Sequence, residues 1–198
     1  MQHGLTLAIA CLIMTKRELE APLDRPIALL GLMGVGKSSI GRRLSDRLRI
    51  DFVDSDQAIE TAAGKSIAEI FADEGEVGFR EGERRVITRL INERDGAFIL
   101  ALGGGAFIND ETRTLIKQRC VSVWLQADID VLLERTSRKP GKRPLLDVED
   151  PRSVLVRLAS EREPYYQQAD LTVRSEADSH DITVDAIIDA LNARTAQG

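Results

Sequence analysis

The chain contains few of the residues on which several classes of functional site depend. Its 198 residues include only two cysteines and two histidines. Two cysteines are too few for a disulfide framework and suit a reducing compartment, so we expect a cytoplasmic protein. The absence of a cysteine–histidine cluster argues against a zinc site or a Ser-His-Asp triad. The net charge of −5 argues against bulk binding of nucleic acid, because no excess of basic residues offsets the acidic ones.

The only early apolar stretch, residues 5–14, is too short to span a bilayer. It also lacks the basic start and the cleavage site of a secretory signal. We therefore expect residues 1–25 to form a loosely ordered leader, in which translation could start at Met14, and a docked helix is the alternative. Residues 26–198 fit a single domain, and the apolar fraction of 43% is sufficient for one core.

The segment Gly31–Ser38 fits the phosphate-loop pattern, in which a glycine and four further residues precede Gly-Lys-Ser. The apolar run 27–30 before it predicts a buried strand, and the apolar residues after it have helical spacing. We therefore expect Lys37 to bridge the terminal phosphates of a nucleotide and Ser38 to ligate Mg²⁺. The alternative is a glycine-rich turn that binds nothing. The residues expected to contact the phosphates are Gly34, Val35, Gly36, Lys37, Ser38 and Ser39.

A pair of carboxylates follows a second strand candidate, residues 50–54, which ends in Asp54-Ser55-Asp56. Residues two apart on a strand point to the same side, so both carboxylates would project together, about 7 Å apart. Such a pair is costly unless cations lie beside it. A Mg²⁺ ion at Asp54 and a substrate hydroxyl at Asp56 would explain it. The alternative is a solvated turn whose acids cap a helix.

Three further segments carry signals with two interpretations each. Arg80 and Glu83 share one face of a predicted helix, as part of a site or as a surface ion pair of small value. The glycines 103–105 directly follow a strand candidate, which indicates either backbone held against a ligand or a neighbouring strand, or a flexible turn. The basic, proline-broken segment 138–144 is typical of a mobile loop, and its charge suits phosphate or simply solvent.

Strand candidates alternate with predicted helices along the whole chain. This alternation predicts a parallel sheet that helices cover on both faces. The strand candidates are residues 27–30, 50–54, 97–102, 121–125 and 169–173. The helix candidates after the phosphate loop are residues 57–63, 76–94, 109–117, 128–135, 151–163 and 181–193.

Taken together, seven short motifs resemble those of the shikimate kinase family, and the likeness covers roughly residues 27–193. The resemblance implies an α/β P-loop NTPase fold of the nucleoside-monophosphate-kinase type, a three-layer sandwich around a central five-stranded parallel sheet. A substrate-binding insertion over about 55–95 and a lid over about 138–149 are also implied. The motifs are Gly-Leu-Met-Gly-Val-Gly-Lys-Ser-Ser, Phe-Val-Asp-Ser-Asp, Ser-Ile-Ala-Glu-Ile-Phe, Gly-Phe-Arg-Glu-Gly-Glu, Leu-Gly-Gly-Gly-Ala, Arg-Pro-Leu-Leu and Arg-Glu-Pro-Tyr-Tyr.

The resemblance implies that ATP phosphorylates the 3-hydroxyl of shikimate, with Mg²⁺ as cofactor. The implied catalytic residues are Lys37, Asp56, which would face that hydroxyl, and Arg143 of the lid, which would meet the phosphates. Arg135 would stack on adenine, and Asp54 would hold Mg²⁺ through water.

For the acceptor, the resemblance implies that Arg80 and Arg162 grip the shikimate carboxylate and that Glu83 orients Arg80. Gly104 and Gly105 would lie under the ring. The expected partners are ATP and shikimate, with no nucleic acid and no membrane, and we expect a monomer.

The chain departs from the family pattern at two places. Gly82 stands where a bulkier helix residue is usual, and residues 175–179 lack the basic residue and the proline that some relatives use near adenine. Two rival functions stay open: a gluconate or nucleoside-monophosphate kinase of similar architecture, and a non-catalytic nucleotide switch. The triple glycine and the Arg-Glu-Pro-Tyr-Tyr motif argue against the first, and the lack of Asn-Lys-x-Asp argues against the second.

Overall fold

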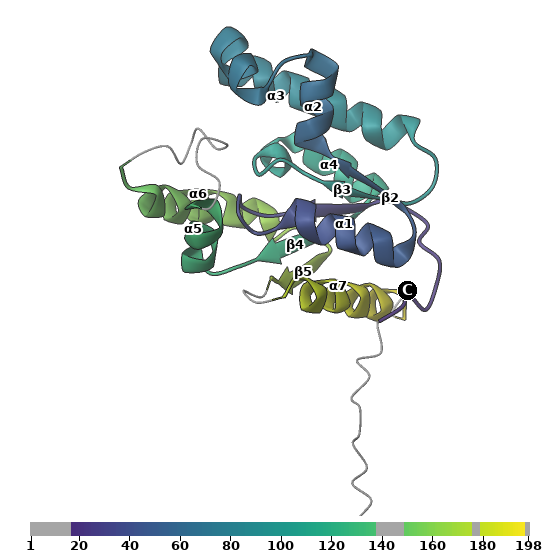
Figure 1. The fold of residues 1–198 in the computed structure, drawn as a ribbon. Helices are drawn as coiled ribbons and strands as arrows, with labels where there is room; N and C mark the ends of the chain where they lie inside the picture. The colour runs from purple at the N-terminus through teal and green to yellow at the C-terminus, as the bar shows by residue number, and fades with distance from the viewer. Residues whose placement is uncertain (1–16, 138–148, 176–178, 197–198) are drawn as a thin grey trace, which may run out of the picture.

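The computed structural model describes residues 17–137, 149–175 and 179–196. They form a five-stranded, wholly parallel sheet in the order β2-β3-β1-β4-β5 (Figure 1). The strands are β1 (Ile27–Leu30), β2 (Asp51–Asp54), β3 (Phe98–Ala101), β4 (Val121–Gln126) and β5 (Leu171–Arg174). The helices are α1 (Lys37–Leu48), α2 (Ser55–Ala63), α3 (Ile67–Glu93), α4 (Asp110–Arg119), α5 (Ile129–Ser137), α6 (Pro151–Tyr166) and α7 (His180–Thr195), with a 3₁₀ turn η1 (Ala106–Ile108).

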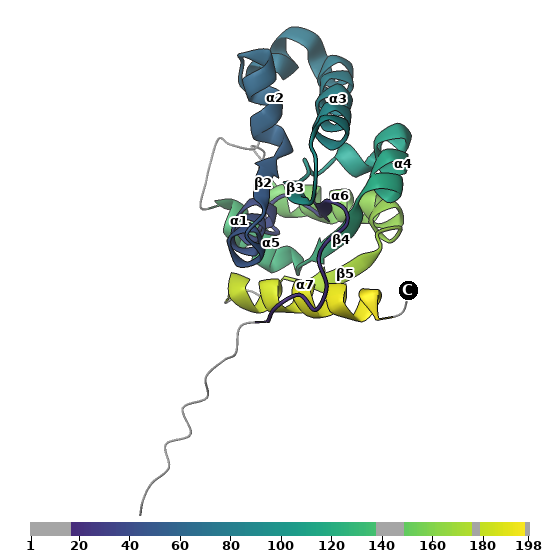
Figure 2. The same cartoon turned by 90° about the vertical axis from the view of Figure 1, so that its right-hand side faces the viewer.

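The sheet is buried on both faces, as the strand composition predicts. All residues of β1 and β3 are buried, because parallel strands are joined by helices that pack on either side. Figure 2 shows α1 and α4 on opposite sides of the strands, with α7 packed beneath β5. The predicted five-stranded parallel sheet between helical layers is therefore confirmed.

All the predicted strands are present, and the differences lie mainly at the helix ends. Helix α2 begins at Ser55 rather than at residue 57, because the Asp54 side chain accepts a hydrogen bond from the Asp56 N–H and caps the helix there. Helix α6 continues through Pro164 to Tyr166, beyond the predicted end at residue 163. A proline in the last turn removes only one backbone hydrogen bond from the helix.

Helices α2 and α3 form a unit that projects beyond the β2 edge of the sheet (Figures 1 and 2). The unit has a small core of its own around Ile59, Ile70 and Phe79. A capping box starts α3: the Ser66 side chain accepts from the Glu69 N–H, and the Glu69 carboxylate accepts from the Ser66 N–H. Gly75 has a φ of 70° and interrupts the helical path of α3.

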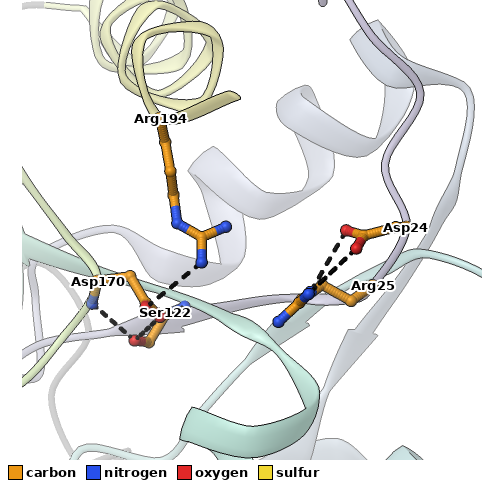
Figure 3. A network of polar contacts seen from close by, with 5 residues as sticks. All are labelled: Asp24, Arg25, Ser122, Asp170 and Arg194. Carbon is orange, nitrogen blue, oxygen red and sulfur yellow. Dashed lines mark hydrogen bonds and ion pairs between the residues drawn. The ribbon is translucent and has the colours of Figure 1, made fainter. Parts of the chain in front are cut away.

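At the amino ends of the strands, a polar cluster ties β4, β5 and α7 together (Figure 3). The buried Ser122 donates to Asp170 through its N–H at 2.8 Å and through its hydroxyl at 2.6 Å. The Asp170 N–H donates back to the Ser122 hydroxyl, and Arg194 of α7 lies 3.7 Å from the other Asp170 oxygen. This cluster leaves the carboxyl ends of the strands free for a site.

The described part of the predicted leader, residues 17–25, contacts the domain. The Glu20 N–H donates to Asn192 Oδ1 at 3.0 Å, and Asn192 donates in turn to the Glu18 carbonyl at 2.9 Å. Leu19 and Leu23 pack against the core. Residues 1–16 lie outside the described residues, so the expectation for them stays a prediction.

None of the helices in the described ranges is long and apolar enough to cross a membrane. The predicted lid lies outside the described residues except for Glu149, and so does Arg143.

Candidate active site

The phosphate loop joins β1 to α1 at the centre of the sheet. Its first glycine, Gly31, has a φ of 135°, and a Cβ atom there would lie 2.5 Å from the Leu125 carbonyl oxygen of β4. Gly36, at the N-cap of α1, has a φ of 102° and no side chain to accept from the first-turn N–H groups. A helix that starts this way presents its N–H groups and its positive dipole end to an anion.

The last two residues of the phosphate loop, Lys37 and Ser38, both make side-chain hydrogen bonds. Lys37 Nζ donates to the carbonyl oxygens of Gly31 and Leu32, at 2.8 and 3.1 Å. The Ser38 hydroxyl donates to Asp54 Oδ2 of β2 at 2.6 Å. The structure therefore brings the predicted phosphate lysine and the predicted magnesium pair to one edge of the sheet. Ser39 is exposed in the first turn of α1.

Asp54 and Asp56 are close together, but not for the predicted reason. The prediction placed both on one strand with their side chains on the same side, whereas Asp56 lies in the first turn of α2. Burial, and then the Asp54 charge, raise the pKa of Asp56 to about 6, while Lys37 acts in the opposite direction. Asp56 can therefore exchange a proton near neutral pH, which a general base requires.

Arg80 and Glu83 form a partly buried pair rather than a surface ion pair. Arg80 Nη1 donates to Glu83 Oε2 at 2.8 Å, and Glu83 is only 3% exposed. Burial raises the pKa of Glu83, and the charges of Arg80 and Arg162 oppose that rise. A second, exposed carboxylate, Glu76, lies 3.3 Å from Arg80 Nη2. The guanidinium group of Arg80 is therefore held from two sides.

The glycines after β3 bring two guanidinium groups against the backbone. Arg162 of α6 is 5% exposed and donates from Nη1 to the Gly104 carbonyl at 2.8 Å. The Tyr166 hydroxyl donates to the same carbonyl oxygen. A Cβ atom on Gly105 would lie 2.6 Å from Arg80 Nη1, so a side chain there would displace that arginine. The prediction of backbone held against a ligand site fits this segment better than a flexible turn.

At the other end of the phosphate loop, Arg135 of α5 contacts the loop itself. Its Nη1 donates to the Val35 carbonyl at 3.1 Å and to the Ser175 hydroxyl at 3.2 Å. The His180 ring lies 3.1 Å from the position of a Cβ atom on Gly36. Burial and the charge of Arg135 lower the pKa of His180.

Sequence reasoning missed several residues of this site. His180 carries no local pattern that marks it, because α7 reaches the loop only through the fold. Ser175 belongs to the segment 175–179 that was noted near adenine, but its hydrogen bond to the Val35 carbonyl was not expected. Tyr166 was seen only as part of a motif. Ser55 and Gly103 lie within the predicted carboxylate and glycine segments but were given no role there. The Gly103 N–H donates to the Ser55 hydroxyl at 2.8 Å, which joins the start of α2 to the segment after β3.

The assembled groups suit transfer of a phosphate to a small anionic acceptor. The anion-binding loop, the Asp56 carboxylate and the guanidinium groups of Arg80 and Arg162 all lie close to the glycine segment 103–105. Guanidinium forks match carboxylates in shape and charge. Among the described residues, no group of three or more histidine, cysteine or acidic side chains is arranged to hold a metal ion.

The chain is similar to known shikimate kinases in sequence and in fold. A sequence model of shikimate kinase matches residues 33–192. The shikimate kinase of Nitrobacter winogradskyi is 51% identical over 174 residues, which are 88% of this chain and 80% of that protein. The solved shikimate kinase from Acinetobacter baumannii, in complex with shikimate, has a TM-score of 0.82 at 36% identity and covers 87% of this chain and 96% of its own.

A gluconokinase from Sinorhizobium meliloti is more distant, at 18% identity and a TM-score of 0.59 over 89% of this chain and 96% of its own. That likeness shows a common fold alone. The shikimate kinase structures confirm the predicted P-loop kinase fold.

Proposed function

The chain belongs to the shikimate kinase family, and we propose that it transfers the terminal phosphate of ATP to the 3-hydroxyl of shikimate, giving shikimate 3-phosphate and ADP. The observation that carries the proposal is the pair of guanidinium groups, Arg80 and Arg162, held against the same glycine segment that Asp56 approaches. A gluconate or nucleoside-monophosphate kinase has no equal support, and a non-catalytic switch does not need the acceptor groups.

Shikimate would bind through its carboxylate to Arg80 and Arg162. Glu83 and the exposed Glu76 each accept from one Nη atom of Arg80, and a guanidinium carries five N–H groups, so others are left for a ligand. Arg162 is buried and bonded to the Gly104 carbonyl, so its direction is set before substrate arrives. Fixed donors of this kind save the cost of ordering them on binding.

Asp56 would face the acceptor hydroxyl. Its raised pKa means that the carboxylate can accept the hydroxyl proton as the oxygen attacks the phosphate. General-base assistance of this type contributes about 10²–10⁴ in rate. Gly104 and Gly105 would support the ring and keep the hydroxyl beside Asp56.

ATP would bind with its phosphates in the loop Gly34–Ser39. Lys37 now donates to two loop carbonyls and would turn to the terminal phosphates. Arg135, beside the Val35 carbonyl, would contact the base. Arg143 is proposed from the sequence alone to meet the transferring phosphate.

Magnesium fits the donors at this edge. The Ser38 hydroxyl and the Asp54 carboxylate are hard oxygen donors 2.6 Å apart beside the phosphate loop, and Mg²⁺ prefers a few such donors together with phosphate and water. Ser38 would bind the ion directly and Asp54 through water. When bound, the ion neutralises charge on the phosphate oxygens.

Product identification tests the proposal. The protein is incubated with ATP, Mg²⁺ and shikimate, and the product is analysed by phosphorus NMR and mass spectrometry. We expect one phosphate monoester on the carbon that bears the 3-hydroxyl. A phosphate on another hydroxyl would contradict the acceptor geometry. We further propose that the protein is a cytoplasmic monomer. Sedimentation of the purified protein tests its oligomeric state.

A further inference from the structure

Gly103 is a glycine for a reason other than backbone conformation. Its φ is not positive, unlike that of Gly31 or Gly36. A Cβ atom at Gly103 would instead lie 2.7 Å from Asp56 Oδ1 and 2.7 Å from Glu83 Oε1. Both distances are shorter than real Cβ atoms show, so the missing side chain of Gly103 makes room for two carboxylates.

Ser55 holds this glycine at the end of the β2–β3 ladder. The last paired residues are Asp54 and Ala101, because the backbone turns into α2 at Ser55. Beyond that pair, the fully buried Ser55 hydroxyl accepts a hydrogen bond from the Gly103 N–H at 2.8 Å. A side-chain oxygen thus replaces the next backbone acceptor and ties the first residue of α2 to the glycine segment.

We propose that Gly103 and Ser55 are positioning residues for the Asp56 carboxylate. Ser55 fixes the start of α2 against the glycine segment, and Gly103 lets the carboxylate of the next residue, Asp56, lie against that segment beside Glu83. This proposal rests on the proposed function, in which Asp56 faces the acceptor hydroxyl.

A methyl group at residue 103 would displace Asp56 rather than Glu83. Glu83 is 3% exposed, and its other oxygen is held by Arg80 at 2.8 Å. Asp56 is less enclosed and lies at the start of its helix. A shift of about 1 Å in a reacting group can cost about 100-fold in rate. Folding should suffer less, because the group that moves is the end of a side chain.

The test compares Gly103→Ala with Gly82→Ala. Gly82 is a matched control, because a Cβ atom there would meet nothing within 4 Å. For Gly103→Ala we expect kcat with shikimate to fall about 100-fold, with the KM for ATP and the affinity for ADP within twofold of the parent. For Gly82→Ala we expect kcat to be unchanged. Ser55→Ala should lower kcat about tenfold, again with ADP binding retained. A kcat of Gly103→Ala within twofold of the parent would overturn the proposal.

A double-mutant cycle separates positioning from general damage. In an Asp56→Ala background, Gly103→Ala should have little further effect on the residual kcat, because the group that it displaces is gone. An equal fall in both backgrounds would contradict the proposal.

Urea unfolding of the same four proteins gives a reading that does not depend on turnover. Gly103→Ala should lower the unfolding midpoint more when Asp56 is present than when it is alanine. If the two substitutions are coupled in stability but the protein does not phosphorylate shikimate, the proposed function is wrong and the contact between residue 103 and Asp56 is right. If the protein phosphorylates shikimate but the substitutions are not coupled, the contact is wrong and the function is right.

Discussion

Arg80 and Glu83, one helical turn apart on α3, form a partly buried pair in which Arg80 Nη1 lies 2.8 Å from Glu83 Oε2. Their spacing alone is that of many surface ion pairs. The 3% exposure of Glu83 distinguishes this pair from a surface ion pair, because a buried carboxylate needs a charged partner. Glu83 thereby aims the Arg80 guanidinium at the glycine segment, where Arg162 also lies.

Replacing either arginine should weaken shikimate binding selectively. Arg80→Ala and Arg162→Ala each remove one charged hydrogen-bond partner of the carboxylate, which typically costs about 1.5–3 kcal/mol. The affinity for shikimate should fall about 10- to 100-fold, while the affinity for ATP stays nearly unchanged. Titration calorimetry with each ligand measures both.

Arg85→Ala is the control on the same helix, because Arg85 is exposed and pairs only with Glu81 among the described residues. It should leave both affinities unchanged. A loss of ATP binding as large as the loss of shikimate binding in the Arg80 or Arg162 variants would make these arginines nucleotide or folding residues.

Asp56 should destabilise the unliganded protein at alkaline pH. Its pKa is raised from 3.8 to about 6 in the folded state, so the folded protein binds the proton more tightly than the unfolded chain. Ionised Asp56 therefore lowers the free energy of unfolding above pH 6, by at most about 3 kcal/mol. Asp56→Asn should be more stable than the parent at pH 8, and this advantage should shrink as the pH falls below 6 and vanish below 3.8.

Urea denaturation of both proteins at pH 8 and pH 4.5 measures this advantage. An advantage of Asn that stays constant, or grows, toward acid pH would contradict the assignment of the raised pKa to Asp56.

Local patterns predicted one part of this site and could not predict the other. Lys37 and Ser38 are set by the loop that contains them, so a contiguous motif identifies them. The closeness of Asp54 and Asp56 was expected from strand alternation. It arises instead because β2 ends at Asp54, which is itself the N-cap of α2, so Asp56 lies in the first turn of that helix. The alternation argument was wrong although both residues were chosen.

Long-range contacts decided the remainder. Gly103 and Ser55 are in contact because β2 and β3 are neighbours in the sheet. The strand order does not follow from local sequence patterns. His180 reaches Gly36 because α7 packs against α1. Glu83 likewise differs from a surface acid because the packing of α3 buries it. Its helical spacing from Arg80 does not indicate that burial.

Removing the N-terminal segment in two steps should separate residues 1–16 from those that contact the domain. Deletion of residues 1–16 should leave Tm and activity unchanged. Deletion of residues 1–23 removes Leu19 and Leu23 from the core surface and the two hydrogen bonds to Asn192, so Tm should fall. Differential scanning calorimetry of both variants measures this. An equal Tm for the two would show that residues 17–23 contribute no stability.

Arg143 should act on the chemical step. An arginine that meets the transferring phosphate contributes about 10³–10⁵ in rate in related systems, and its contact is complete only near the transition state. Arg143→Ala should therefore lower kcat far more than it raises the KM for shikimate, and Arg143→Lys should restore only part of the rate because an ammonium lacks the fork. Lys142→Ala is the neighbouring control and should have a small effect. Steady-state kinetics of the three variants measure these effects. A near-normal kcat in Arg143→Ala would show that residues 138–149 are only a solvated connector.

The most direct test of the central claim is ADP release measured with ATP, Mg²⁺ and a panel of acceptors. Turnover should require shikimate, ATP and Mg²⁺ together and should be negligible with gluconate or a nucleoside monophosphate, because only shikimate offers both a carboxylate to Arg80 and Arg162 and a hydroxyl to Asp56. Equal turnover with gluconate or a nucleoside monophosphate, or ATP hydrolysis at the same rate with no acceptor, would contradict the assignment.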